Sequence, residues 1–228
     1  MLLNEMLGIK YPIIQGGMAN IATGKFAAQV SNAGALGLIA SGGMNAEALE
    51  KEIAECRKLT DKPFGVNLML MNPDVDNIAQ LLADEKIGII TTGAGMPGKY
   101  MGMWKANGSK VIPVVASTAL ARKVEQQGAD AVIAEGGESG GHVGDMTTMT
   151  LVPQVIEKVS IPVIAAGGIA TGKQFVAAMA LGAVGVQIGT CLLVSEECPI
   201  HENYKLALIK ARAVSYTHLR AHETGAYL

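Results

Sequence analysis

The sequence is poor in aromatic residues and cysteines and has no excess of either charge. Only 4% of its 228 residues are aromatic, and 18 Lys and Arg stand against 20 Asp and Glu. The net charge of −2 and the lack of a basic block argue against a nucleic-acid-binding surface. The three cysteines, Cys56, Cys191 and Cys198, have no metal-ligand or redox spacing, and no set of His, Cys or carboxylates has ligand spacing. We therefore expect neither a nucleic-acid partner nor a metal site.

Long apolar runs and a leader sequence are also missing. No apolar stretch reaches the ~20 residues of a membrane span without an interrupting glycine or polar residue. Residues 1–10 do not have the form of a signal peptide. A sparse, odd number of cysteines fits reduced thiols in a cytosol. These features predict a cytoplasmic protein with no membrane segment.

Short apolar runs dominate what is present. Most are apolar at every position rather than at alternate positions, which is typical of parallel strands covered on both faces. Pro12, Pro63 and Pro162 stand at the start of three of them, where no ladder donor is lost. Pro113 lies inside another run, so we expect that strand to begin later than its apolar residues suggest. Eight strands are predicted, over residues 12–18, 35–40, 64–70, 87–92, 111–116, 129–134, 162–168 and 183–190.

Segments with helix start and stop signals lie between these runs. Each begins after a side chain that can cap a helix or with a proline suited to the first turn. They are residues 46–59 after Asn45, 73 to about 83 with Pro73, 118–127 after Ser117 and 172–181 after Thr171. Eight strand-then-helix units in a chain of this length predict an α/β fold, a (β/α)8 TIM barrel, which we assign to residues 1–213.

An open doubly wound sheet is the alternative fold. Residues 93–98, Gly-Ala-Gly-Met-Pro-Gly, follow a predicted strand and match the G-x-G-x-x-G pattern of dinucleotide-binding loops. That fingerprint also needs an acid at the end of the next strand, about 20 residues further on. The next strand ends Val115-Ala116-Ser117, without an acid. We therefore interpret the match as an ordinary strand-to-helix loop.

The last residues break the pattern. From about Val214 the sequence has neither a helical nor a strand period, and residues 215–224 resemble translated sequencing-adapter read-through. On this interpretation residues 214–228 are a non-native, disordered tail, and His218 and His222 have no function. A genuine polar tail is the alternative.

Chemistry in such a barrel is expected in the loops that follow the strands. The most unusual of these loops, residues 134–144, is nearly half glycine and contains His142, the only histidine before residue 200. An imidazole can donate or accept a proton near pH 7. Glu135 opens the same loop. The alternative is a flexible glycine loop with a solvated histidine.

Polar or small residues close several other strands. Residues 15–19 contain two glycines, which let a flat ligand lie against the backbone. Asn67 is polar inside an apolar strand and is either a satisfied core amide or a ligand contact. Thr91 and Ser117 end further strands with hydroxyls.

The loops after the last two strands are rich in glycine. They are residues 165–172, which run into a helix, and residues 187–190. Backbone N–H groups bared by glycine near a helix N-terminus bind anions, and this pair of loops is the usual phosphate site of phosphate-binding barrels. Plain tight turns are the alternative. The pattern alone therefore predicts a barrel that holds a phosphorylated ligand beneath one histidine.

At these motifs the sequence resembles the FMN-dependent enoyl-acyl-carrier-protein reductase II family, within the nitronate monooxygenase-like flavoprotein superfamily. The resemblance covers about residues 1–213 and consists of many matches in order. The matching stretches are residues 11–18, 61–67, 90–95, 111–115, 128–136, 140–142, 147–151, 161–169 and 187–190.

This resemblance implies that FMN lies across the top of the barrel. A nicotinamide, NADH or NADPH, would pass hydride to the flavin, which would pass it to the β-carbon of a trans-2-enoyl-acyl-carrier-protein thioester. His142 would polarise the thioester or supply the α-carbon proton. The partner would be the acyl carrier protein, and a homodimer is left open. The residues implied to contact FMN are Gly17, Met18, Ala19, Asn67, Glu135, Gly141 and Gln187, with Gly167, Gly168, Gly189 and Thr190 at its phosphate.

Two other functions stay open at this point. Members of the resembled family continue past the last helix with a C-terminal segment that helps to cover the active site, and here the tail takes its place. The chain could then be an inactive, truncated flavin-binding barrel. A nitronate monooxygenase shares the same motifs; its histidine would take a proton from a nitroalkane, and oxygen would reoxidise the flavin.

Overall fold

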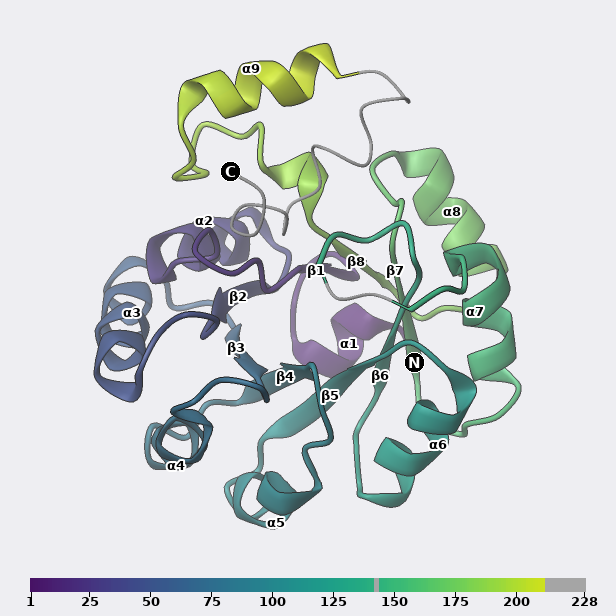
Figure 1. Ribbon diagram of the computed structural model, residues 1–228, viewed down its shortest axis with the longest axis horizontal. Coiled ribbons are helices and arrows are strands. Elements are labelled where there is room, and N and C mark those ends of the chain that lie inside the picture. The colour runs from purple at the N-terminus through teal and green to yellow at the C-terminus, as the bar shows by residue number, and fades with distance from the viewer. Residues whose placement is uncertain (142–143, 212–228) are drawn as a thin grey trace.

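Eight parallel strands form a ring, with helices around its outside (Figure 1). The computed structural model describes residues 1–141 and 144–211, so the predictions for His142 and for the tail 214–228 lie outside the described residues. The strands are β1 (Ile13–Gln15), β2 (Gly37–Ala40), β3 (Phe64–Met69), β4 (Ile89–Gly93), β5 (Lys110–Val115), β6 (Val132–Glu135), β7 (Val163–Ala166) and β8 (Val186–Ile188).

A helix follows each of the first seven strands. These helices are α2 (Gly24–Ala33), α3 (Ala46–Leu59), α4 (Val75–Asp84), α5 (Gly98–Ala106), α6 (Thr118–Gln126), α7 (Thr148–Ile156) and α8 (Gly172–Ala180). After β8 the chain makes a 3₁₀ turn, Thr190–Leu192, and then α9 (Glu202–Lys210), while α1 (Leu3–Leu7) precedes β1. The predicted (β/α)8 barrel is confirmed.

The ring closes between β1 and β2, which excludes the open doubly wound sheet. The sheet runs in the order β1-β8-β7-β6-β5-β4-β3-β2. The N–H of Gln15 donates to the Leu36 carbonyl, and the N–H of Leu36 donates to the Ile13 carbonyl, both at 2.9 Å. The loop at residues 93–98 accordingly leads from β4 into α5, as in any other unit of the barrel.

The side chain of Gln15 extends this closure where the backbones of β1 and β2 no longer pair. Its Oε1 accepts from the N–H of Leu38 at 3.1 Å, and its Nε2 donates to the Leu38 carbonyl at 3.2 Å. The same Nε2 donates to the Gly16 carbonyl at 2.5 Å. A buried side-chain amide thus takes the place of a strand peptide at the seam.

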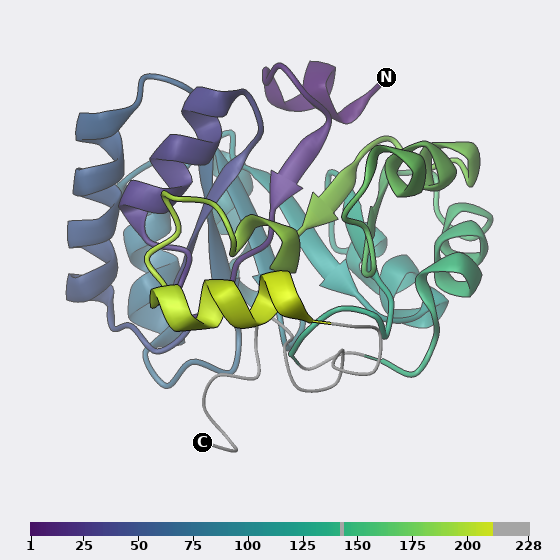
Figure 2. The ribbon, with the colours of Figure 1, turned by 90° about the horizontal axis from the view of Figure 1, so that it is seen from above.

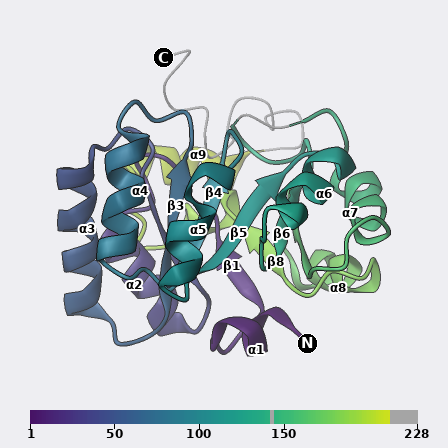
Figure 3. The ribbon, with the colours of Figure 1, turned by 90° about the horizontal axis from the view of Figure 1, so that it is seen from below.

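The barrel has an apolar interior, and α1 closes it at the N-terminal ends of the strands. Leu3 and Leu7 of α1 pack with Ile14, Leu36 and other inward-facing residues of the strands. Figures 2 and 3 show α1 at the end of the barrel from which the strands start, so the opposite end is the mouth. Helix α1 could not be predicted from the sequence, because its five residues are too few to show a helical period.

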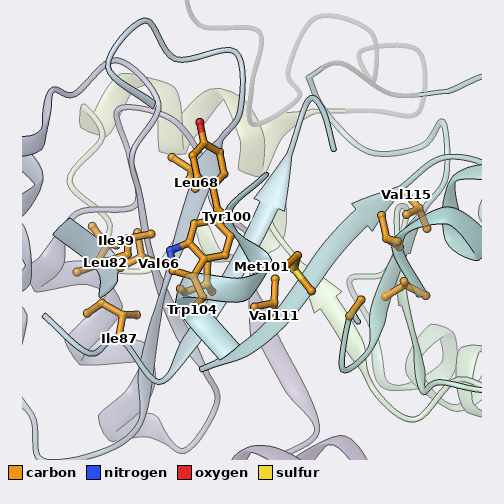
Figure 4. Close-up of a cluster of buried hydrophobic side chains, with 14 of the residues drawn as sticks. Ile39, Val66, Leu68, Leu82, Ile87, Tyr100, Met101, Trp104, Val111 and Val115 are labelled. Atoms are coloured by element: carbon orange, nitrogen blue, oxygen red, sulfur yellow. The ribbon is translucent and has the colours of Figure 1, made fainter. Parts of the chain in front are cut away.

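A second apolar layer lies between the strands and the outer helices. Trp104 is fully buried there, and its Nε1 donates to the Ala79 carbonyl at 2.9 Å. Tyr100 packs on it with ring centroids 5.4 Å apart. Figure 4 shows the rings of Tyr100 and Trp104, both from α5, against side chains of β3 and α4, including Val66 and Leu82. This double covering explains why the strands are apolar at every position.

Most of the local predictions are confirmed, and two are wrong. Asn45, Ser117 and Thr171 cap their helices as predicted, each accepting from an N–H three residues on. Pro73 precedes α4 by two positions rather than lying in its first turn. Pro113 lies within β5, which begins at Lys110 and not after the proline.

The neighbouring strand explains why β5 tolerates this proline. The N–H of Lys110 donates to the Gly88 carbonyl on the β4 side, and the N–H of Val111 donates to Asp130 on the β6 side. Because N–H groups alternate along a strand, Pro113 has its missing donor on the β6 side. Pairing with β6 begins only at Val114, so no ladder bond is lost.

The described residues contain neither a membrane-spanning helix nor a cluster of metal ligands. None of the helices there is long and apolar enough to cross a membrane. Residues 1–141 and 144–211 also contain no group of three or more His, Cys, Asp or Glu that could hold a metal ion. All three cysteines are free thiols.

Replacing Gln15 by leucine tests the seam between β1 and β2. The variant keeps the bulk but leaves the buried N–H and carbonyl of Leu38 without the amide that pairs with them, so we expect a loss of roughly 2–4 kcal/mol in the free energy of unfolding. Urea unfolding measures this loss. Gln80→Leu, at an exposed position of α4, is the control and should change the value little; equal values for both variants would contradict the role of Gln15.

Candidate functional site at the mouth of the barrel

Four polar side chains form a layer above the apolar interior. They occupy inward positions near the ends of their strands, two residues beyond inward apolar positions such as Ile89 and Ile133. Strand register places Asn67 beside Thr91, and Glu135 and Gln187 on either side of Ala166. The four residues are Asn67 of β3, Thr91 of β4, Glu135 of β6 and Gln187 of β8.

The amide of Asn67 is held between a hydroxyl and a glycine. The Oγ1 of Thr91, which is fully buried, donates to its Oδ1 at 2.9 Å. A Cβ placed on Gly17 would lie 2.4 Å from the Asn67 Cβ and 2.6 Å from its Nδ2, so only glycine fits there. Among the described residues nothing accepts from Nδ2. The oxygen of Asn67 is therefore paired, whereas its Nδ2 has no acceptor in the described part of the chain, and a ligand contact by this amide stays a prediction.

The side chain of Gln187 is almost fully buried at the end of β8. It is 9% exposed, and its amide makes no hydrogen bond to the described part of the chain. It lies against the turn at Gly16 and Gly17, because a Cβ on Gly16 would be 3.7 Å from the Gln187 Cδ. A buried amide without a partner costs free energy, and such a group is usually paired with water or a ligand.

Glu135 lies at the start of the histidine loop and is only partly exposed. Burial raises the pKa of its carboxyl from 4.5 to about 7, and a hydrogen bond from the side chain of Ser139 opposes that rise. A carboxyl that titrates near neutral pH can exchange protons at the mouth of the barrel.

The turns after β7 and β8 are adjacent, as the prediction of a phosphate site requires. Gly167 and Gly168 have φ values of +110° and +67°, in the region that favours glycine. The Sγ of Cys191, after β8, lies 4.0 Å from the Ile169 carbonyl, after β7. In residues 1–141 and 144–211, no group accepts from the N–H of Gly168, Gly189 or Thr190. These donors are therefore available to an anion.

Glu138 and Thr148 tie the histidine loop to the end of β7. The Glu138 carboxylate accepts from the N–H of Thr148, with the shorter contact at 2.8 Å, and from its Oγ1 at 2.9 Å. That hydroxyl also lies 3.0 Å from the Gly167 carbonyl. A Cβ on Gly136 would lie 2.2 Å from it. The loop is thus attached on both sides of Gly141, which is exposed, with φ +86°.

Other predicted residues have supporting positions. Met18 is fully buried, and its Sδ lies 3.6 Å from where a Cβ on Gly189 would be, so it packs against the turn after β8. Ala19 abuts Gly42 in the loop after β2. Contact of these two residues with a flavin stays a prediction. Ser117 caps α6 and has no place in the polar layer.

Sequence reasoning missed the pairing of Thr91 with Asn67 and the contacts of Glu138 with Thr148. Thr91 was noted only as a hydroxyl at the end of a strand. Its partner is 24 residues away, and only the register of β3 against β4 brings the two together. The signal that could have indicated it is the occurrence of two polar residues at inward positions of consecutive apolar strands.

A (β/α)8 barrel with free amides and two glycine turns at its mouth has the layout of a barrel enzyme. The chain belongs to the nitronate monooxygenase family, whose model matches residues 1–85 and 77–226. It is 34% identical to a probable nitronate monooxygenase of Staphylococcus aureus, covering 92% of this chain and 72% of that protein. The family and its relatives are flavin oxidoreductases.

Solved structures agree with this assignment. FabK of Thermotoga maritima is 53% identical with a TM-score of 0.90, over 92% of this chain and 67% of that one. A nitroalkane oxidase of Streptomyces ansochromogenes is 30% identical with a TM-score of 0.83, over 90% and 72%.

A further relative has another activity in its name. It is the Rhodococcus jostii (3aS,4S,5R,7aS)-5-hydroxy-7a-methyl-1-oxo-octahydro-1H-indene-4-carboxyl-CoA dehydrogenase, 39% identical over 89% of this chain and 58% of that protein. A counterpart from Mycobacterium tuberculosis is covered over 60% of its length. The chain thus spans about three-fifths of these curated relatives.

Glu135 predicts a pH dependence of stability. Because its pKa is raised on folding, the folded protein holds this proton more tightly than the unfolded chain. The resulting stabilisation is complete below pH 4.5 and is lost as the pH rises to about 7. We expect about 1–3 kcal/mol, a value reduced for the partial exposure of the group.

The measurement is the free energy of unfolding in urea at pH 4.5 and at pH 8. Glu135→Gln should lose less stability between the two pH values than the unchanged protein does. Glu197→Gln removes an exposed carboxylate and is the control. The same pH dependence in all three proteins would show that Glu135 does not titrate as described.

Proposed function

We propose that this chain forms the FMN-binding barrel of an enoyl-acyl-carrier-protein reductase, which uses NADH or NADPH to reduce trans-2-enoyl thioesters in fatty acid elongation. The observation that carries the proposal is the 53% identity and TM-score of 0.90 to FabK, together with the free donors at the mouth. The activity belongs to a protein of the full family length, of which this chain holds the barrel.

The residues present fit FMN. Gly168, Gly189 and Thr190 offer N–H groups at adjacent turns that have no acceptor within residues 1–141 and 144–211, and such groups suit a phosphate. The Nδ2 of Asn67 and the side-chain amide of Gln187 have no hydrogen-bond partner in the described part of the chain. Gly17 has no room for a side chain against Asn67, which leaves a flat backbone surface for a ring.

The chemistry that bound FMN supplies is hydride transfer from the nicotinamide to the β-carbon of the enoyl thioester. The turns at Gly168 and at Gly189–Thr190 would hold the phosphate through their N–H groups. Asn67 would donate from Nδ2 to an acceptor of the ring, and Gln187 would pair through its amide with another polar atom. Burial raises the pKa of Glu135 to about 7, so this carboxyl would hold a proton at the same end of the barrel as Asn67 and Gln187.

The resemblance adds a role for His142. It would donate a hydrogen bond to the thioester carbonyl or a proton to the α-carbon. The acyl carrier protein would bring the substrate to the mouth, since the plug at α1 closes the other end of the barrel. A homodimer stays a prediction.

A nitronate monooxygenase is the second candidate. The family model and the 34% identity to the Staphylococcus aureus protein favour it. In that case His142 would take a proton from the α-carbon of a nitroalkane, oxygen would serve as the electron acceptor, and no nicotinamide would be needed. An inactive flavin-binding barrel remains the third outcome of the tests below.

Substitution of Gly168 tests the phosphate site. Asp and Asn are isosteric and both tolerate the positive φ of this position, so their difference isolates charge. Gly168→Asp places a carboxylate beside the phosphate, and we expect its Kd for FMN to exceed that of Gly168→Asn by about tenfold or more. Flavin fluorescence titration measures both values. Equal affinities would contradict a phosphate at this turn.

An activity test separates the candidates. The protein is this chain, alone and joined to the C-terminal segment of FabK, and the substrates are crotonyl thioester with NADH or NADPH and propionate 3-nitronate with oxygen. We expect nicotinamide oxidation that depends on the thioester, and a loss of roughly 10²–10⁴-fold in His142→Ala with FMN still bound. Oxygen uptake without nicotinamide would favour the monooxygenase, and bound FMN without turnover of either substrate would favour the inactive barrel.

A further inference from the structure

Thr91 and Thr92 are adjacent, fully buried threonines that differ in the hydrogen bonding of their hydroxyls. The Thr91 hydroxyl faces the barrel interior and donates to Asn67 Oδ1 at 2.9 Å. Thr92 faces the outer layer, in register with Leu68 and Pro113, and its Oγ1 has no hydrogen-bond partner within the described residues. Only the first hydroxyl is in a position to act on the site.

The Thr91 hydroxyl has one proton to donate, and the only acceptor it meets in residues 1–141 and 144–211 is Asn67 Oδ1. If the Asn67 amide turned over, its Nδ2 would face this hydroxyl, and the buried hydroxyl proton would lose its acceptor. Leaving such a group unpaired costs about 1–3 kcal/mol. Gly17 packs against the other side of Asn67 and limits its movement further.

We propose that Thr91 is a positioning residue that holds the Asn67 amide with its NH₂ group toward the mouth of the barrel, so that a bound ring meets a hydrogen-bond donor there and not an acceptor. The proposal rests on the proposed binding of FMN for its effect on the ring, but the orientation of Asn67 is a property of the protein alone.

A fixed donor distinguishes the two redox states of a flavin ring. The reduced ring carries more negative charge at its polar edge than the oxidised ring, and a donor stabilises the more negative form more strongly. Without Thr91 the amide can turn its oxygen toward the mouth, which would repel that charge. Thr91 therefore favours the reduced state of the bound cofactor without touching it.

The test compares Thr91→Val with Thr92→Val, each of which replaces one buried hydroxyl by a methyl group of similar size. We expect Thr91→Val to weaken binding of reduced FMN about tenfold more than binding of oxidised FMN, which corresponds to a midpoint potential lower by about 30 mV for two electrons. Thr91→Ser keeps the hydroxyl and should restore the potential. Thr92→Val should leave the potential unchanged.

A second measurement needs no flavin. The side-chain NH₂ signals of Asn67, identified by their loss in Asn67→Asp, should shift in the NMR spectrum of Thr91→Val and not in that of Thr92→Val. Equal potentials and unchanged Asn67 signals in Thr91→Val would overturn the proposal while leaving FMN binding intact. Shifted Asn67 signals in a protein that binds no FMN would uphold the orientation and refute the proposed function instead.

Discussion

The closure between β1 and β2 is the constraint on which the rest of the structure depends. Seven of the eight neighbouring strand pairs make regular ladders, whereas this one has two backbone hydrogen bonds through Leu36 and the amide of Gln15. A side chain completes the ring because the backbone of β1 does not pair with β2 beyond Gln15, although the N–H of Gly16 still donates to the Ile188 carbonyl of β8 at 2.8 Å. The position of the turn at Gly16 and Gly17, against Asn67 and Gln187, follows from the end of that pairing.

The mouth combines tight packing of the backbone with polar groups that have no partner among the residues the structure describes. Gly17 leaves no space above Asn67, Gly136 leaves none beside Thr148, and the turn at Gly167 lies against the same hydroxyl. The protein thus holds its loops rigidly through glycine contacts and through the hydrogen bonds of Glu138. Against this fixed frame, Gln187 and the N–H groups of the last two turns remain available, which is the arrangement expected of a site organised in advance for a ligand.

The fold could be predicted from the sequence because its signals are local. Runs apolar at every position, prolines ahead of strands and the caps at Asn45, Ser117 and Thr171 each depend on a few neighbouring residues. Contacts between strands could not be predicted in this way. Gln15 reaches Leu38 over 23 residues and Thr91 reaches Asn67 over 24, so both depend on register. Pro113 was misjudged for the same reason, since its tolerance depends on where β6 begins to pair.

The single tryptophan gives the barrel an intrinsic optical label at a defined place. Trp104 lies outside the strands, against α4, with its indole bonded to Ala79, whereas the polar layer lies inside the ring at the ends of β3, β4, β6 and β8. Its emission therefore reports on the α4–α5 flank, and the visible absorbance of a bound isoalloxazine would report on the mouth. Unfolding of the α4–α5 flank and loss of the bound cofactor can therefore be followed as two separate spectroscopic signals in one sample.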